Sequence, residues 1–430
     1  MLIKNDASTM MPISDIPQTD LDSIPIDPFW NLGDDKELKM HRIHAYPAKF
    51  PAFITSKAIE FAKQSGLKVS CIADIFCGCG TVAFEARRSN IDFWGCDINP
   101  VATMIAKVKS HKFQTKRLQN YFESIVEQFE HYSFSSTYDE ANERLKYWYD
   151  KKHYDSLYKL KVAIESSTPK KSIYRLFFLC AFSNILKPTS CWLAKSIKPT
   201  VSKNKVPAEV SRVFKLQCSF MIKANSENSK KSHSRVKILT GNILSSSTKK
   251  PWVDMIVTSP PYVTSYEYAD IHQLSTLWLN IAQDFRAMRK GTIGSSHQKF
   301  DLEKELNSLN KTGHEIVVKL QDAHEVSRAR SVAKYFVDME KTAKICYDML
   351  KSDGLALFVI GNTEYKGVRI DNAHHFAESL KQHGFTRISV TKRKISNKIL
   401  TPFRDSEGHF TSDKQGRKIY SEEFILIALK

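Results

Sequence analysis

The sequence predicts an α/β protein with a doubly wound, Rossmann-like sheet that carries a largely helical insertion. Two stretches, at about residues 41–111 and 236–430, alternate between apolar strands and amphipathic helices. Between them, residues 112–235 show only helical patterns and basic, irregular segments. Alternating strands and helices are typical of a mostly parallel sheet covered by helices on both faces. Two such stretches around one helical segment favour a single sheet with an insertion over three independent domains.

The charge of the chain indicates a polyanionic partner. The 430 residues carry 64 Lys and Arg against 46 Asp and Glu, a net charge of +18. This excess favours nucleic acid first and an anionic membrane surface second. No stretch approaches the roughly 20 apolar residues of a membrane span, and residues 1–22 lack the apolar core of a secretion signal. We therefore expect a cytoplasmic protein without a membrane segment.

The first 50 residues show no regular apolar period. Residues 1–40 predict an arm that lies over another part of the chain or is partly disordered. His41 and His44 follow, but no third ligand lies near them in the sequence. The eight cysteines form no Cys-x-x-Cys pair. We therefore expect neither a metal site nor a disulfide framework. Pro51 suits the first turn of a helix that ends at Gly66.

A glycine turn follows the first strong strand. Val69–Phe76 predicts this strand, Cys77–Thr81 the turn, and residues 82–88 a helix. Glycines let the backbone approach a bound group, and the N–H groups at the helix start attract an anion. Asp97 ends the next strand, at 91–96, where a carboxylate can accept both hydroxyls of a ribose. A dinucleotide-dependent oxidoreductase shares this pattern, and so does a tight turn beside a surface aspartate.

Residues 112–235 interrupt the alternation with segments rich in Tyr, Phe and Lys. Apolar spacing predicts helices at 122–129, 143–160, 172–186 and 206–222. Basic, irregular segments at 194–199 and 202–205 lie between the last two. Interleaved basic and aromatic residues are typical of nucleic-acid contacts, although helices with lysines outside and aromatics inside give the same pattern.

The second half of the sheet contains a strand that ends in Ser259-Pro260-Pro261-Tyr262. Met255–Val257 is an apolar run, and the two prolines force the chain out of the sheet after it. Ligands of an open α/β sheet bind where strands end, so we expect this turn beside the glycine turn. The other strands are expected at 236–240, 355–360, 388–393 and 424–429, and the helices at 266–281, 301–320, 329–350 and 373–383.

The residues of this second turn suit a flat ring that carries an amino group. The Ser259 hydroxyl and the Pro260 carbonyl can accept hydrogen bonds from an NH2 group, and the face of Tyr262 can stack on the ring. An exocyclic amine is a poor nucleophile because its lone pair is delocalised into the ring. Two acceptors that hold both hydrogens favour sp3 geometry and stabilise the positive charge that develops on the nitrogen. A base in a duplex must first be flipped out of the stack.

These motifs resemble those of the S-adenosylmethionine-dependent amino-methylating DNA methyltransferases. Thr258 followed by Ser259–Tyr262 is similar to the catalytic motif of the cytosine-N4 branch, whereas adenine-N6 enzymes typically begin this motif with Asp or Asn. Asp74–Thr81 resembles the cofactor loop of the family, and His44–Phe50 resembles the segment before the cofactor half. Asp97 matches the ribose acid. Ile75 departs from the usual proline of the loop.

The resemblance implies a division of the chain. Residues 41–111 correspond to the cofactor-binding half and 236–430 to the catalytic half of the methyltransferase domain, with the motif resemblance itself reaching about residue 365. By position and charge, 112–235 is a candidate target-recognition region. The implied catalytic residues are Ser259, Pro260, Pro261 and Tyr262. The residues implied to bind S-adenosyl-L-methionine are Tyr46, Lys49, Phe50, Asp74, Phe76, Gly78, Gly80, Thr81, Asp97, Ile98 and Asn242. Asn242 stands where the family often has an acid, and its amide carbonyl can still accept a hydrogen bond.

The implied activity is site-specific methyl transfer from S-adenosyl-L-methionine to N4 of cytosine in double-stranded DNA. A restriction–modification system is the expected setting, with a cognate restriction endonuclease as a possible partner. Adenine N6 in DNA and guanine N2 in RNA stay open because they share the motif family. A protein-glutamine methyltransferase usually has Asn in place of Ser259, and the net charge argues against it. A non-catalytic nucleic-acid-binding protein fits the charge but not the presence of both motifs.

Overall fold

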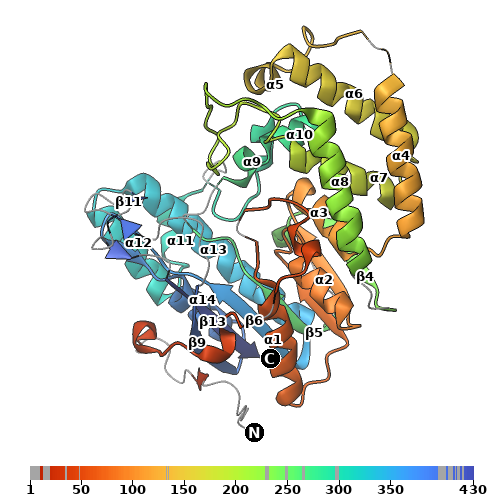
Figure 1. Cartoon of the computed structure of the whole chain (residues 1–430). Coiled ribbons are helices and arrows are strands. Elements are labelled where there is room, and N and C mark those ends of the chain that lie inside the picture. The colour runs from red at the N-terminus through yellow and green to blue at the C-terminus, as the bar shows by residue number, and fades with distance from the viewer. Residues whose placement is uncertain are drawn as a thin grey trace.

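The centre of the molecule is an eight-stranded, mostly parallel sheet (Figure 1). The strand order is β1-β9-β13-β6-β5-β2-β3-β4. These strands are β1 Met11–Pro12, β2 Cys71–Asp74, β3 Asp92–Asp97, β4 Val236–Thr240, β5 Val253–Thr258, β6 Leu350–Ile360, β9 Arg387–Lys394 and β13 Glu422–Leu429. The computed structural model describes residues 10–12, 20–33, 36–47, 49–131, 133, 135–227, 232–246, 250–263, 267–295, 300–395, 403–404, 410–411, 413, 417–418 and 421–430.

The order of the strands reverses between β2 and β5. From β2 the chain winds outward to β3 and β4, and it then returns to β5 on the other side of β2. Ile72 of β2 pairs in parallel with Phe93 of β3 and with Met255 of β5. The carboxyl ends of β2 and β5 therefore lie side by side at the switch point where open α/β sheets bind ligands. The predicted doubly wound sheet is confirmed.

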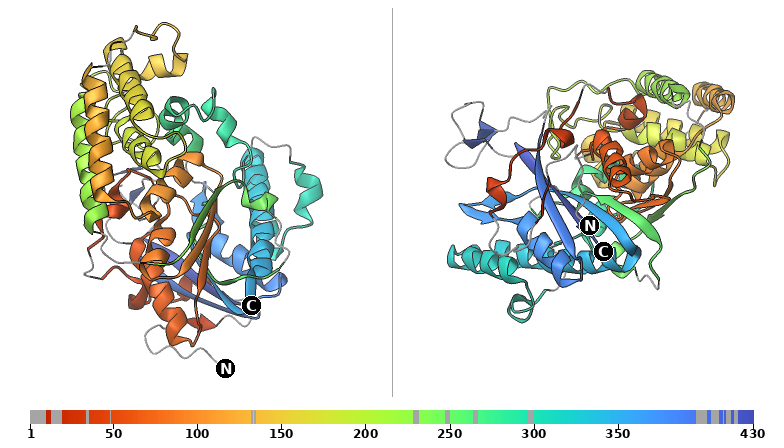
Figure 2. Two further views of the ribbon diagram at one scale, coloured as in Figure 1. Left: turned by 90° about the vertical axis from the view of Figure 1, so that its right-hand side faces the viewer. Right: turned by 90° about the horizontal axis from the view of Figure 1, so that it is seen from below.

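Helices cover both faces of this sheet (Figure 2). The buried strand β5 shows the two faces, because Met255 and Val257 pack in one core cluster and Ile256 packs in the other. The first cluster includes residues of α1 Ala52–Gln64 and α2 Thr81–Arg88, and α3 Pro100–Ser110 packs beside α2. The second includes residues of α12 Lys311–Asp322, α13 Val326–Met349 and α14 Asn372–Gln382. A strand that is buried on both faces explains the continuous apolar run in the sequence.

The insertion between α3 and β4 is helical, as predicted. Its helices are α4 Thr115–His131, α5 Glu143–Trp148, α6 Lys151–Ser167, α7 Ile173–Ile185 and α8 Val210–Glu227. The single helix expected at 143–160 is wrong. Tyr149 is extended, and the Asp150 side chain accepts the backbone N–H of His153, so α6 starts anew.

Two other long helices predicted in the second half are also divided. The stretch 301–320 forms α11 Leu302–Leu306 and α12, because the Asn310 side chain caps a new helix by accepting the N–H of Gly313 at 2.9 Å. The stretch 266–281 forms α9 Tyr268–Ile271 and α10 Gln273–Trp278, with His272 between them. Tyr266, where that helix was expected to begin, lies outside the described residues.

Short strands complete the segment that follows the insertion. β7 Thr363–Tyr365 and β8 Val368–Ile370 form a hairpin. The strands β10 Phe403–Arg404, β11 Phe410–Thr411 and β12 Arg417–Lys418 form a small separate sheet. Within the described ranges, no helix has the length and apolar character needed to cross a bilayer.

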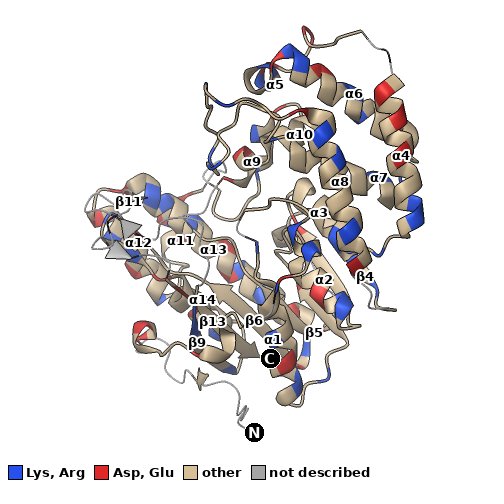
Figure 3. Cartoon of the chain, viewed as in Figure 1, with Lys and Arg blue, Asp and Glu red and all other residues tan. Residues whose placement is uncertain are grey.

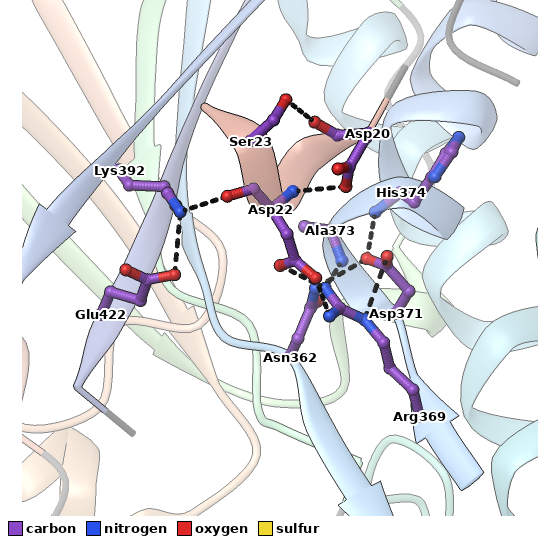
Figure 4. A network of polar contacts seen from close by, with 10 residues as sticks. All are labelled: Asp20, Asp22, Ser23, Asn362, Arg369, Asp371, Ala373, His374, Lys392 and Glu422. Carbon is purple, nitrogen blue, oxygen red and sulfur yellow. Dashed lines mark hydrogen bonds and ion pairs between the residues drawn. The ribbon is translucent and has the colours of Figure 1, made fainter. Parts of the chain in front are cut away.

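The N-terminal arm packs on the outer edge of the sheet. β1 pairs with β9, and Trp30, which is fully buried, contacts the Phe61 ring of α1 at 5.9 Å between ring centroids. Figure 4 shows the polar part of this contact, in which Arg369 after the β7–β8 turn pairs with Asp22 and the Lys392 ammonium donates to the Asp22 carbonyl at 2.9 Å. The described part of the arm therefore packs against the rest of the chain, which is one of the two states expected from the sequence.

Candidate active site

A cleft opens at the switch point between β2 and β5. Its volume is about 2310 Å³. The turn after β2, the turn after β5 and the segment around Tyr46 all line it. Every residue named from the sequence as catalytic or cofactor-binding lines this cleft except Gly80. The expectation that the two turns lie side by side is therefore confirmed.

Gly80 lets the glycine turn pack closely against α3. It adopts φ +77°, and a Cβ atom there would lie 2.6 Å from the Cβ of Ala106 on α3. Only glycine allows both this left-handed backbone and this close approach to the helix. Gly78 also has positive φ, at +46°, but it faces the cleft and lies near the Tyr46 ring. The turn thus has one glycine for helix packing and one whose backbone is open to a ligand.

Asp97 is fixed at the end of β3. Its Oδ2 accepts the N–H of Gly78 at 2.9 Å, and its Oδ1 accepts the N–H of Asn99 at 2.8 Å. Burial raises the pKa of this carboxyl, while the two N–H donors act in the opposite direction. Each carboxylate oxygen still has a lone pair available for another donor. The carboxylate is therefore oriented toward the cleft and can accept hydroxyl groups.

Asp74 joins the two turns. The Thr258 hydroxyl donates to its Oδ1 at 2.6 Å, and the N–H of Phe76 donates to the same atom at 3.1 Å. The side chain is 3% exposed, and burial raises its pKa to about 7. Asp74 links the end of β2 to the end of β5, because Thr258 is the last residue of that strand.

The Ser259 hydroxyl is oriented by the neighbouring strand. Its Oγ donates to the carbonyl of Val359 on β6 at 2.9 Å. A serine hydroxyl has one proton and two lone pairs, so this donation leaves the oxygen available as an acceptor. Pro260 and Pro261 follow it and also line the cleft. The turn therefore presents an acceptor side chain whose own proton is engaged elsewhere.

Tyr262 is held by two residues that the sequence did not indicate. Its hydroxyl donates to Glu423 Oε1 at 2.9 Å, and the Arg393 guanidinium pairs with the same carboxylate. Arg393 is 4% exposed. Tyr262 also lies over Gly361, where a Cβ would come within 3.1 Å of the ring. Burial and the adjacent Glu423 carboxylate raise the pKa of the Tyr262 hydroxyl well above its usual value.

The segment before α1 forms another wall of the cleft. The Tyr46 ring stacks on His272, with 5.1 Å between the ring centroids. Lys49 is engaged by the carbonyl of His41 at 3.1 Å and by the Glu37 carboxylate at 2.6 Å. Phe50 lines the same wall. This arrangement lets Tyr46 face the glycine turn while Lys49 holds the segment in place.

His41 and His44 have different partners. His41 is buried and its Nε2 lies 2.7 Å from Glu85 Oε1, whereas Nε2 of His44 lies 2.9 Å from the Ser183 hydroxyl. Burial lowers the pKa of both rings. Among the residues that the structure describes, no group of three or more His, Cys, Asp or Glu side chains is arranged to hold a metal ion.

Asn242 connects the cleft to the loop before α11. Its Oδ1 accepts the N–H of Leu244 at 3.0 Å, and its Nδ2 donates to the carbonyl of Gly291 at 3.1 Å. The amide oxygen retains a second lone pair that faces no assigned donor among the described residues. Asn242 thus holds this loop at the edge of the cleft.

Comparison with known proteins identifies the kind of chemistry. Residues 253–430 match a family described as DNA methylase, and residues 58–186 match the D12 class N6 adenine-specific DNA methyltransferases. Together these matches support the amino DNA methyltransferase family. They cover the two turns of the cleft separately, and they imply S-adenosyl-L-methionine as the cofactor. They do not distinguish cytosine N4 from adenine N6.

Two relatives of this chain are named Type II methyltransferases. The chain is 24% identical to the Type II methyltransferase M.MvaI of Kocuria varians over 392 residues, which is 85% of this chain and 86% of the relative. It is 27% identical to the Type II methyltransferase M.MjaII of Methanocaldococcus jannaschii over 162 residues, 35% of this chain and 30% of the relative.

The solved structures that align with this chain share little sequence with it. An rRNA methyltransferase, aviRa from Streptomyces viridochromogenes, aligns with 8% identity and a TM-score of 0.28 over 91% of each chain. An S-adenosylmethionine-dependent methyltransferase from Clostridium acetobutylicum aligns with 9% identity and a TM-score of 0.28 over 92% of this chain and 93% of that one.

Proposed function

We propose that this chain transfers a methyl group from S-adenosyl-L-methionine to the exocyclic N4 of cytosine in double-stranded DNA. The observation that carries this proposal is the Ser259 hydroxyl, which donates its proton to the Val359 carbonyl. Its oxygen is therefore committed to accepting. A base amine supplies two N–H donors, and Ser259 with the Pro260 carbonyl supplies two acceptors in the same turn.

The cofactor would lie over the glycine turn and supply an electrophilic methyl group when bound. We assign Asp97 to its ribose hydroxyls, because both carboxylate oxygens are oriented by backbone donors and line the cleft. The start of α2 at Thr81 would offer a backbone N–H group to its charged end, and Gly78, whose own N–H donates to Asp97, would let the backbone approach it closely. We place Tyr46, Lys49, Phe50, Phe76, Ile98 and Asn242 around it, because they line the same cleft.

The chain's own residues would act on the target base. Ser259 and Pro260 would hold the two amine hydrogens, which directs the nitrogen lone pair toward the cofactor and stabilises positive charge as it develops. The N–C bond would form as the bond between sulfur and the methyl group breaks, so that the sulfur leaves as a neutral thioether and the nitrogen then loses one proton to solvent. Tyr262 would stack on the base after it is flipped out, and would replace part of the stacking lost in the duplex. The anchored hydroxyl of Tyr262 keeps its ring in one orientation for this contact.

The base itself is inferred from the motif. Thr258-Ser259 at its start supports cytosine N4, whereas the match to the D12 class supports adenine N6 equally well. Guanine N2 in RNA uses the same kind of site and is a third candidate. The names of the relatives support a restriction–modification setting, in which a cognate endonuclease would act on the same DNA site.

We also propose that the insertion at 112–235 contributes to target recognition. It carries 23 Lys and Arg against 11 Asp and Glu, so most of the net charge of the chain lies in this segment. It also borders the cleft through Arg144, Asn184 and Lys198. A positively charged wall beside the site for the flipped base suits the DNA backbone.

Modification-sensitive single-molecule sequencing of DNA from an expressing host tests the proposed reaction. We expect N4-methylcytosine at one short motif, and none in a host that expresses the Ser259→Ala variant. N6-methyladenine at a motif would keep the mechanism and replace the base. An unmodified genome, with methylated RNA in the same cells, would reject DNA as the substrate.

A further inference from the structure

The loop between α7 and α8 folds back on itself as a hairpin. Trp192 forms an antiparallel bridge with Val201, and the N–H of Leu193 donates to the carbonyl of Thr200 at 2.8 Å. Trp192 is 2% exposed and stacks on Trp148, with 5.0 Å between ring centroids. The hairpin comprises residues 192–201. Its base is therefore anchored by Trp192 in the core of the insertion.

The tip of the hairpin is also held in one conformation. The carbonyl of Ser196 accepts from the Lys187 ammonium at 2.7 Å and from the Trp192 indole N–H at 3.2 Å. The Ser196 hydroxyl donates to the carbonyl of Lys198 at 2.8 Å. A tip ordered in this way loses little conformational entropy when it binds a partner.

The tip reaches the active-site cleft. Ile197, Lys198 and Pro199 line the same cleft as Ser259 and Tyr262. In Figure 1 the yellow-green loop between α7 and α8 extends from the helical insertion toward the lower half of the molecule. A duplex that delivers a flipped base to Tyr262 would therefore pass close to this tip.

The hairpin lies in a stretch without acidic residues. Residues 166–208 contain eight Lys and Arg and no Asp or Glu. Lys195 and Lys198 at the tip are exposed, and no carboxylate of the described residues pairs with either ammonium. Figure 3 shows Lys or Arg in blue on this loop and no red segment within the loop itself. The hairpin itself therefore has no acidic side chain that competes with an anion for its lysines.

The base of the hairpin adds two half-buried lysines. The Lys205 ammonium donates to the carbonyls of Lys187 and Trp192 at 2.8 and 2.7 Å. Burial and the nearby Lys187 charge lower the pKa of Lys205 to about 8. Like charges in one small region repel each other, and a bound polyanion relieves that repulsion.

We propose that the hairpin 192–201 binds the phosphate backbone of duplex DNA beside the cleft and makes no sequence-specific contact with the bases. This inference rests on the proposed DNA methyltransferase function. Side chains that pair with base edges by two hydrogen bonds are Arg, Lys, Asn and Gln, and the hairpin has only lysines among them. Its hydroxyls at Ser196 and Thr200 already donate to the carbonyl of Lys198. Lysine ammonium groups on phosphates fix position and carry no sequence information.

The salt dependence of DNA binding tests this proposal. Each phosphate contact contributes about 0.9 to the slope of log K against log salt. For the Lys195→Ala/Lys198→Ala variant of the full chain, we expect a slope smaller by about 1.8 and a higher KM for DNA. The loss of affinity should be the same on the methylated site and on an unrelated duplex. Calorimetry should give wild-type affinity for S-adenosylmethionine, which shows that the cofactor site is intact.

A matched control has the same change of charge elsewhere in the insertion. Lys170 and Lys171 are exposed, lie in the same acid-free stretch and do not line the cleft. The Lys170→Ala/Lys171→Ala variant should keep the wild-type slope. If the Lys195→Ala/Lys198→Ala variant has the same salt dependence of DNA binding as this control, the proposed phosphate contact of the hairpin is overturned. A tip variant that weakens binding only on the methylated site would also overturn it, because that result requires base readout.

The outcome for the wild type separates this inference from the proposed function. If the wild type methylates DNA and the tip variant has an unchanged salt dependence of DNA binding, only the proposed role of the hairpin is overturned. A wild type that neither methylates nor binds duplex DNA overturns the proposed function, and with it the inference. Binding of the wild type to RNA but not to duplex DNA, with a slope that depends on Lys195 and Lys198, would replace DNA by RNA as the partner.

Discussion

The hydroxyl of Tyr262 connects the turn after β5 to the outer strands of the sheet. Glu423 on β13 accepts a hydrogen bond from this hydroxyl, and Arg393 on β9 forms an ion pair with that carboxylate. Because the carboxylate is charged, this hydrogen bond is stronger than one between neutral groups. We therefore expect Glu423 to act as a positioning residue, which restricts the tyrosine ring without contacting the base.

Tyr262→Phe removes the hydroxyl and keeps the ring. We expect single-turnover methyl transfer to slow by about 10-fold, since a hydrogen bond to a charged group contributes about 1.5–3 kcal/mol and only part of it bears on the ring orientation. Glu423→Gln replaces the charged acceptor by a neutral one and should slow the rate by several fold. In the Tyr262→Phe background the same Gln substitution should have no further effect, because the hydroxyl that it acts through is absent.

The adjacent residue provides the control for this pair. Glu422 pairs with Lys392 at 3.0 Å on the same two strands, and that contact is directed toward the N-terminal arm (Figure 4). Glu422→Gln should leave the transfer rate unchanged. Additive effects of Tyr262→Phe and Glu423→Gln would show that Glu423 acts by another route.

Asp74 should make stability depend on pH. Its pKa is about 7 in the folded chain, against 3.8 as the ordinary value. Between these values the folded state holds a proton that the unfolded state has lost, so the unfolding free energy falls as the pH rises from about 4 to 7. The fall through this group is on the order of 4 kcal/mol, because each pKa unit corresponds to about 1.36 kcal/mol.

Asp74→Asn removes this titration and keeps an acceptor for Thr258 and Phe76. Urea unfolding at pH 5 and pH 8 should therefore show the variant gaining stability relative to the wild type as the pH rises. A constant difference between the two proteins at both pH values would contradict the buried, proton-holding state of Asp74.

The residues that could be found from the sequence are those in short local motifs. Gly78, Asp97 and Ser259 each follow a recognisable strand, and all three line the cleft. Glu423 and Arg393 lie more than 130 residues from Tyr262 in the chain and carry no motif. Only the pairing of β13 with β9 brings them to the site, and a single sequence does not specify which strands are neighbours.

The N-terminal arm is held mainly by apolar packing rather than by its ion pairs. Trp30 is fully buried and contacts Phe61 of α1, whereas the Arg369–Asp22 pair is exposed on both sides (Figure 4). Trp30→Ala should lower the unfolding free energy by about 3–5 kcal/mol, as for other large-to-small changes in a core. Arg369→Ala should lower it by less than about 1 kcal/mol. Chemical denaturation of both variants measures the two values, and a larger loss from Arg369→Ala would contradict this order.

At the level of elements, the sequence indicated type and order better than length. The strand that contains Asp254 and the strand that precedes the glycine turn were expected because each has a continuous apolar run. The divisions at Tyr149 and Asn310 were missed, since apolar spacing continues across both breaks. The signals that could have shown them were local, because Asp150 and Asn310 are side chains that cap a new helix.

The insertion and the α/β core form one packed body. One cluster of buried residues includes Val101 and Ile105 of α3, Phe177 and Phe182 of α7, and Trp278 of α10. The boundaries expected at residues 112 and 235 mark where the α/β pattern stops in the sequence, but this core crosses both of them. We therefore expect the insertion to depend on the rest of the chain for its stability.

Trp278 tests this shared core because it follows the insertion in the chain but packs against residues of the insertion. Its ring lies 5.0 Å from that of Tyr154 and 5.8 Å from that of Phe182, between ring centroids. Trp278→Ala should leave a cavity that costs about 3–5 kcal/mol locally. Hydrogen exchange should then show faster opening of α6 and α7 than in the wild type, with less change in α14. Phe376→Leu, in the core on the other face of the sheet, should give the reverse pattern. Unchanged protection of α6 and α7 in the Trp278→Ala variant would show that the insertion is stable without this contact from the segment that follows it.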